Sequence, residues 1–222
     1  MKNILILSFF LLNSVISFGQ NKDCRCYKGI GSNDQDIPNL IYNFPNGQKI
    51  SVCGFEQNRT ADNELLITEF NVFNCETGTV YIEYEALQNC KVSIKNNVLE
   101  IIELRLYPAG ENWEWMPLPI GMERIYEKGN DIISTGQLAF YHNITIKKER
   151  IDAFYIELEN MKLKGEREDL ELIIGKLELL ALNGEEKAKS ILFDFENYFN
   201  YLTDGAIAEL WKDAVATVEW IK

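Results

Sequence analysis

Two tryptophans, Trp113 and Trp115, lie close together in a segment rich in proline and glycine that covers residues 107–121. This composition predicts a long, ordered loop, because proline and glycine interrupt both helices and strands. Aromatic side chains on such a loop can stack on sugar rings or anchor a protein partner, since they bury a large area at little entropic cost. The alternative is that the tryptophans plug the interior, where large aromatic side chains usually lie. The residues predicted to bind a ligand or partner are Tyr107, Trp113, Trp115 and Met116.

Residue types that usually carry catalysis are arranged without a recognisable motif. The single histidine, His142, lies in a strand-like stretch with no nucleophile motif nearby, and the chain contains no G-x-S-x-G, H-E-x-x-H or phosphate-binding loop pattern. A hydrolase with paired carboxylates is the weaker alternative, because Glu83 and Glu85 share a strand face. With 34 acidic residues, such pairs arise by chance. We therefore predict that the protein is not an enzyme and uses no cofactor.

Five cysteines lie in the N-terminal part of the chain: Cys24, Cys26, Cys53, Cys75 and Cys90. A zinc site would usually need paired C-x-x-C motifs or additional histidines. One C-x-C pair and a single histidine favour disulfides, and no metal site is predicted. Cys75 and Cys90 appear at opposite ends of one predicted strand, too far apart for a bridge. The expected pairs are Cys53–Cys90 and Cys75 with Cys24 or Cys26.

Residues 1–19 have the pattern of a cleavable secretory signal. Lys2 supplies the positive charge, Ile4–Leu12 forms a short apolar run, and Ser17 and Gly19 are small residues before the expected cut. The apolar run is shorter than the roughly 20 residues that span a bilayer. We therefore expect a periplasmic or secreted protein with no membrane span after cleavage.

The charge balance limits the class of partner. The net charge is −12, and acidic residues exceed basic residues throughout the chain. Without a basic patch to neutralise phosphates, nucleic acid is not expected as a partner. A protein partner, in particular a basic one, fits this charge, and a glycan is a further possibility.

Hydrophobic periodicity predicts an α+β fold. Residues 20–146 form a β-rich, disulfide-containing region, where apolar residues alternate with a period of two. Two hairpins are predicted, one joining 40–44 to 49–55 and the other joining 65–73 to 79–87. These hairpins indicate an antiparallel β-meander, built as a sheet or a small sandwich.

The period changes to about 3.6 in residues 147–222, where apolar stripes predict a bundle of about four antiparallel helices. Gly165 ends the first helix, and Asn183 with Gly184 ends the second. No glycine, proline or serine linker separates the two regions, so the helices can pack on the sheet as one unit.

The expected function follows from these features together. An exported, acidic chain without catalytic motifs fits a non-enzymatic interaction protein, such as an immunity or inhibitor protein that neutralises a partner in the cell envelope. The alternative is a module that binds glycans or the cell wall through the Trp113/Trp115 loop.

Overall fold

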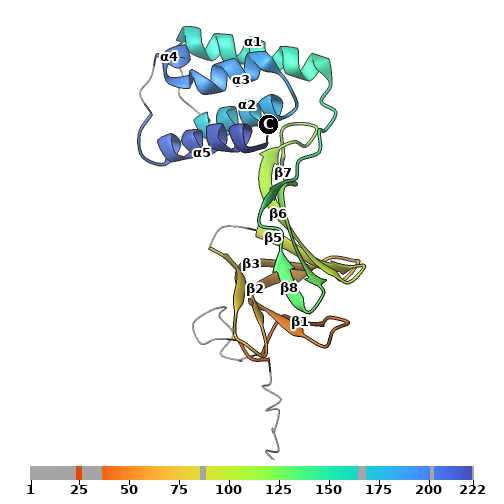
Figure 1. Ribbon diagram of the computed structural model, residues 1–222. Coiled ribbons are helices and arrows are strands. Elements are labelled where there is room, and N and C mark those ends of the chain that lie inside the picture. Colours follow the sequence, from red (N-terminus) through yellow and green to blue (C-terminus); the bar gives the residue numbers. More distant parts are fainter. Residues whose placement is uncertain (1–23, 27–36, 86–88, 165–168, 201–202, 222) are drawn as a thin grey trace, which may run out of the picture.

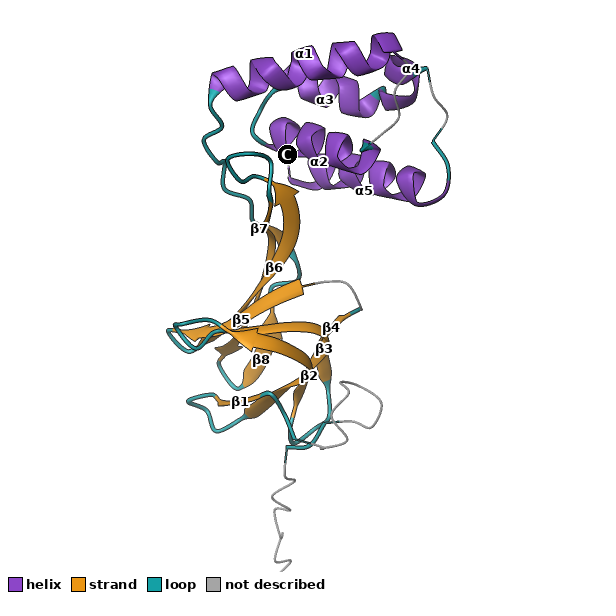
Figure 2. Ribbon diagram, turned by 180° about the vertical axis from the view of Figure 1, so that it is seen from behind, coloured by secondary structure: helices purple, strands orange, loops and turns teal. Residues whose placement is uncertain are grey.

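The computed structural model has the α+β architecture predicted from the sequence: an antiparallel sheet followed by helices (Figures 1 and 2). The predicted signal peptide lies outside the residues that the structure describes. Those residues are 24–26, 37–85, 89–164, 169–200 and 203–221.

Nine antiparallel strands form one sheet in the described part of the chain, with the main order β1-β2-β3-β5-β6-β7-β8. Strand β4 pairs with β3, and β9 pairs with β7. Both predicted hairpins are present. The sheet curls so that β4 contacts β8 around a buried core that includes Ile50, Val52 and Phe70. The strands are β1 (Leu40–Asn43), β2 (Lys49–Arg59), β3 (Leu65–Asn74), β4 (Val80–Tyr84), β5 (Asn89–Lys95), β6 (Val98–Pro108), β7 (Trp115–Lys128), β8 (Asp131–Ser134) and β9 (Leu138–Ala139).

The disulfides correct one expected pairing. Cys24 is bonded to Cys75, as one of the two predicted alternatives requires, but Cys53 is bonded to Cys26 instead of Cys90. Cys90 is a free, buried thiol. Its side chain is 1% exposed and belongs to the hydrophobic core of the sheet. Local sequence could not distinguish these pairings, because they depend on how the segment near residue 25 lies across β2 and β3.

Five helices follow the sheet within the described ranges, and they form two layers (Figures 1 and 2). Helices α2 and α5 lie nearest the sheet, whereas α1, α3 and α4 lie farther away. About four helices were predicted, and the structure describes one more because the helical segment after Gly184 is divided at Asp194 into α3 and α4. The helices are α1 (Lys148–Lys164), α2 (Leu170–Leu182), α3 (Glu186–Phe193), α4 (Phe195–Phe199) and α5 (Gly205–Ile221).

Helix α2 is the centre of the helical half. It contacts α3, α5 and β6, and it is buried on almost every side. A helix that is apolar nearly all round must be surrounded by other elements. Two charged residues of α2, Lys176 and Glu178, are buried as well, and each has an ionic partner from another element.

The connection between sheet and helices is a two-stranded ribbon formed by the ends of β6 and β7 (Figure 2). The predicted loop over 107–121 is therefore wrong in extent, because β6 continues to Pro108 and β7 begins at Trp115. Pro117 and Pro119 are tolerated in β7 because they occupy alternate positions on an edge with no second partner strand among the described residues. Tyr107 and Ile120 of this ribbon belong to the same hydrophobic core as the helices.

Candidate binding cleft

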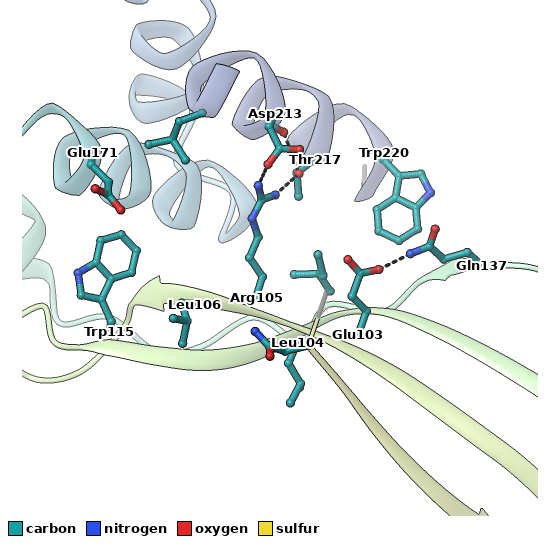
Figure 3. A pocket seen from close by; sticks show the side chains of 13 residues that line it. Glu103, Leu104, Arg105, Leu106, Trp115, Gln137, Glu171, Asp213, Thr217 and Trp220 are labelled. Atoms are coloured by element: carbon teal, nitrogen blue, oxygen red, sulfur yellow. Dashed lines mark hydrogen bonds and ion pairs between the residues drawn. The ribbon is translucent and has the colours of Figure 1, made fainter. Parts of the chain in front are cut away.

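A cleft of about 750 Å³ lies between the β6–β7 ribbon and helices α2 and α5 (Figure 3). We call it the sheet–helix cleft. Residues more than 100 positions apart in the chain meet here, since β6 and α5 supply opposite walls. The side chains that define it are Glu103, Arg105, Leu106, Trp115, Glu171, Asp213 and Trp220.

Trp115 stands at one end of the cleft. Its side chain is 44% exposed, and it rests against Gly175 of α2. A Cβ atom added at Gly175 would lie 3.0 Å from the Trp115 ring and 3.2 Å from Pro108, so glycine permits this close approach. Glu171, in the first turn of α2, is directed toward the Trp115 ring (Figure 3).

Trp220 stands at the other end. It extends from α5, is 41% exposed, and lies over Gly121 of β7. A Cβ atom added at Gly121 would lie 3.1 Å from the Trp220 ring, 3.2 Å from the Gln137 amide and 3.3 Å from a Glu103 carboxylate oxygen. The Gln137 amide donates a hydrogen bond to Glu103. An aromatic face, a carboxylate and an amide therefore converge at this end.

Arg105 crosses the cleft between the two tryptophans (Figure 3). Its guanidinium group lies 3.3 Å from the Glu178 carboxylate, forms an ion pair with Asp213 and donates a hydrogen bond to Thr217. These contacts attach β6 to both α2 and α5. They also neutralise the only positive charge among the residues that line the described cleft.

Glu178 is held deep behind the cleft. The Tyr107 hydroxyl donates a 2.8 Å hydrogen bond to its carboxylate. Burial raises the pKa of Glu178 above its usual value, although Arg105 and the Tyr107 hydroxyl act in the opposite direction. Burial also raises the pKa of Tyr107, and the Glu178 charge adds to this increase.

The cleft has an acidic and apolar character. Glu103, Glu171 and Asp213 carry three formal negative charges against one positive charge on Arg105, which leaves a net charge of two minus. Such a surface favours cationic groups and hydrogen-bond donors, while the tryptophan faces favour flat, apolar or cationic groups.

The four residues predicted from the sequence to bind a ligand are separated by the structure. Tyr107 is 1% exposed and donates its hydroxyl to Glu178, so it belongs to the core. Trp113 packs against Phe154 of α1 in the same core. Trp115 lies in the cleft, and Met116 is exposed but does not line it.

Two cationic side chains lie near the partly buried ring of Trp113. The Arg150 guanidinium lies 3.6 Å from the centre of the Trp113 ring, and the Lys176 ammonium lies 5.1 Å away. Trp113 has a φ angle of +63°, a left-handed conformation that is unusual for a large side chain. Packing of the indole therefore compensates for backbone strain, and Trp113 fits the plug alternative.

Sequence reasoning missed Trp220, Glu171 and Arg105. A signal for Trp220 was present, since it falls outside the apolar stripe of its own helix, whereas Trp211 lies on that stripe. The indole of Trp211 donates a 2.7 Å hydrogen bond inside the helical half to the carbonyl of Leu192. A large aromatic residue off the buried stripe is a candidate for a surface contact.

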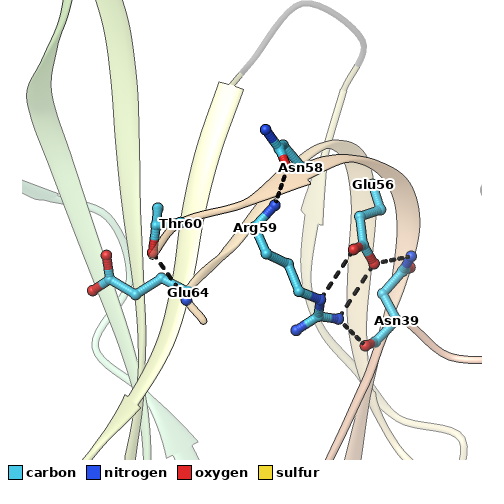
Figure 4. A network of polar contacts seen from close by, with 6 residues as sticks. All are labelled: Asn39, Glu56, Asn58, Arg59, Thr60 and Glu64. Carbon is cyan, nitrogen blue, oxygen red and sulfur yellow. Dashed lines mark hydrogen bonds and ion pairs between the residues drawn. The ribbon is translucent and has the colours of Figure 1, made fainter. Parts of the chain in front are cut away.

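A smaller cavity of about 270 Å³ lies at the far end of the sheet, near the turn between β2 and β3. Arg59, Glu64 and Lys95, which line it, all take part in ion pairs, and Figure 4 shows the contacts of Arg59. Arg59 contacts Glu56 at 3.0 Å and the Asn39 carbonyl. Glu64 forms ion pairs with Lys91 at 3.1 Å and Lys95 at 3.5 Å. These contacts stabilise the sheet end, and the sheet–helix cleft is the better binding candidate.

The remaining chemical candidates are dispersed. His142 is exposed and its ring contacts Phe140 edge-on at 4.7 Å. Within the described ranges, no group of three or more histidine, cysteine, aspartate or glutamate side chains is arranged to hold a metal ion. None of the described helices is both long enough and apolar enough to cross a membrane.

Comparisons of this chain with models of protein families, with curated proteins and with solved structures found no match. The function must therefore be argued from the geometry of the cleft.

Proposed function

We propose that this chain is an exported, non-enzymatic binding protein that holds a protein partner in the sheet–helix cleft. The observation that carries the proposal is the pair of exposed tryptophans, Trp115 and Trp220, which stand at opposite ends of one cleft. Protein interfaces gain most of their affinity from a few such aromatic anchors surrounded by polar groups.

The surroundings of the tryptophans support a protein partner. Leu106, between them on β6, is also exposed, so the cleft presents an apolar floor with charged groups beside it. Apolar anchors with a polar rim are the usual anatomy of a protein interface. The glycines beneath both tryptophans fix the position of the rings, which reduces the entropy lost on binding.

The two disulfides fit an oxidising compartment outside the cytoplasm. A periplasmic or secreted location is the specific form of this proposal. In that setting, the protein acts as an immunity or inhibitor protein that occupies and neutralises a partner in the envelope.

A glycan is the second candidate ligand. It is favoured by the group at Trp220, where Glu103 and Gln137 lie beside an exposed indole face. Aromatic faces with adjacent polar side chains can stack on a sugar ring and bond its hydroxyl groups.

The first test is capture of a partner by the full-length gene product, purified after export, from envelope and secreted fractions of its source. A Trp115→Ala/Trp220→Ala variant runs beside it. The matched control is Ile156→Ala/Leu163→Ala, which removes two exposed apolar side chains from α1, away from the cleft. We expect one stoichiometric protein that the cleft variant loses and the control retains. Equal capture by all three proteins would reject the cleft as the binding site.

A further inference from the structure

Aromatic rings elsewhere in this protein are accompanied by cations from the chain itself. The Arg150 guanidinium lies over the face of Trp113, and the Lys162 ammonium lies 4.1 Å from the centre of the Tyr198 ring. The Lys187 ammonium lies 4.2 Å from the centre of the Tyr155 ring in α1. Neither Trp115 nor Trp220 has such a lysine or arginine among the described residues. The two rings at the ends of the cleft therefore present faces that a cation from outside could occupy.

Each of these rings also has a carboxylate beside it. Glu171 is directed toward Trp115, is exposed, and has no ion-pair partner in the portion of the chain that the structure covers. Glu103 and the Trp220 ring approach the same point above Gly121, and the neutral Gln137 amide donates to Glu103. An aromatic face next to a carboxylate attracts a cation by two mechanisms, the ring quadrupole and the opposite charge.

The centre of the cleft does not oppose a cationic ligand. Arg105, which lies between the two ends, is neutralised by Glu178 and Asp213. The lining then carries an excess of negative charge, and the whole chain has a net charge of −12. A basic segment would approach a surface of complementary charge, whereas an acidic segment would be repelled.

We infer that the cleft binds an extended, basic segment of a protein partner, with one lysine or arginine side chain over Trp115 beside Glu171 and a second over Trp220 beside Glu103. This inference rests on the proposed function and specifies its partner class. The apolar stems of these side chains lie along Leu106 between the two ends.

The probes for the test are capped synthetic peptides with two arginines separated by about two to six alanine or serine residues, a range that covers different extended spans. Each peptide has a twin in which neutral citrulline replaces both arginines. Binding to the full-length, exported protein is measured by tryptophan fluorescence, because two of the four tryptophans are the proposed contacts.

Glu171→Gln is the main variant, and Glu149→Gln is its matched control. Both carboxylates are exposed and lie in the first turn of their helix, so both substitutions remove the same charge from the same kind of position. We expect an arginine peptide of one spacing to bind best, Glu171→Gln to weaken it about tenfold, and Glu149→Gln to change it less than about twofold. Trp115→Ala and Trp220→Ala should each weaken it to a similar degree.

Different outcomes separate this inference from the proposed function. If citrulline peptides bind as well as arginine peptides, the basic segment is rejected while the cleft remains a peptide site. The inference is also rejected if no peptide changes the fluorescence, or if only oligosaccharides do so. Unaltered partner capture by the Trp115→Ala/Trp220→Ala variant would instead reject the proposed function itself.

Discussion

Trp113 and Trp115 are separated by one residue, yet they belong to two regions with opposite properties. Around Trp113 is a packed junction, formed with Arg150, Phe154 and Lys176, in which the ring is partly buried and cations of the chain lie near its face. Around Trp115 is the sheet–helix cleft, in which the ring is 44% exposed and no lysine or arginine of the described residues lies over its face. The difference shows that residue type and local sequence do not separate an aromatic side chain packed against the core from one exposed in a cleft.

The largest expected loss of stability comes from breaking the ion pair between Arg105 and Glu178, which lies behind the cleft. Arg105→Ala leaves the Glu178 carboxylate buried without its cation and should lower the free energy of unfolding by about 3–4 kcal/mol at neutral pH. Urea denaturation measures this change. In the Arg105→Ala/Glu178→Gln double variant the loss should be smaller, because no buried charge remains. If the double variant lost as much free energy of unfolding as the two single variants together, the two residues would not be coupled.

Removal of the Trp113 side chain tests how much its packing contributes to stability. Trp113→Ala should lower the free energy of unfolding by about 3 kcal/mol, because it leaves a cavity beside Phe154 and unstacks Arg150. Trp113→Gly should be less harmful by about 1 kcal/mol, because glycine adopts the +63° φ angle without strain. Denaturation of the two variants side by side checks both statements, and a loss below about 1 kcal/mol for alanine would show that Trp113 is not a plug.

The buried carboxylate behind the cleft should make stability depend on pH. The pKa of Glu178 is raised on folding, so between the ordinary value of 4.5 and the raised value the folded protein holds a proton that the unfolded chain releases. The contribution of Glu178 is therefore complete below pH 4.5 and is lost as the pH rises through the folded pKa. Glu178→Gln should show a weaker decline, and the free-energy difference from the wild type should grow in its favour with pH. A difference independent of pH would contradict the raised pKa.

Trp115 should show the reverse of the behaviour of Trp113. Trp115→Ala should change the free energy of unfolding by less than about 1 kcal/mol, because nearly half of the side chain is already exposed. Partner binding should nevertheless weaken by at least about tenfold, as expected for an aromatic anchor. Unfolding and binding measured on the same preparation would sharpen the comparison. If Trp115→Ala were as unstable as Trp113→Ala, the two tryptophans would have the same structural role.

The smallest effect is expected at the glycine beneath Trp115. Gly175→Ala should leave the free energy of unfolding within about 1 kcal/mol, because better helix propensity offsets the crowding of the ring. The added methyl group would lie 3.0 Å from the Trp115 ring and displace it by a few tenths of an ångström. Peptide binding should weaken about twofold to fivefold, and the tryptophan emission should shift. Gly129→Ala cannot serve as the control, because the positive φ angle of Gly129 would strain an alanine. The control is instead Ala153→Ser, an exposed position on α1 away from the cleft.

Much of the fold could be predicted because its signals are local. The asparagine pair Asn96 and Asn97 marks the turn between β5 and β6, and both residues have the positive φ angles that this turn requires. Apolar residues three and four apart marked α1, α2 and α5 in the same way. Proline was less reliable as a signal. Pro117 lies inside a strand, because that edge of β7 has no described partner to lose a hydrogen bond.

The candidate site could be predicted only in part. Trp115 was identified from its loop, but its partners Glu171 and Trp220 come from helices 56 and 105 residues later in the chain. Trp113 was identified by the same argument, and the structure packs it, partly buried, against Phe154 of α1.

The sequence by itself determined the fold class, the positions of most helices and strands, and the acidic charge, because periodicity, turn residues and composition act over a few neighbouring residues. Only the tertiary structure decided that Cys53 is bonded to Cys26, that Glu178 is buried against Arg105, and that Trp115 faces a cleft while Trp113 packs against the core. These features depend on contacts between elements distant in the chain. Such contacts are selected by how the buried faces of sheet and helices fit together, and no local pattern encodes that fit.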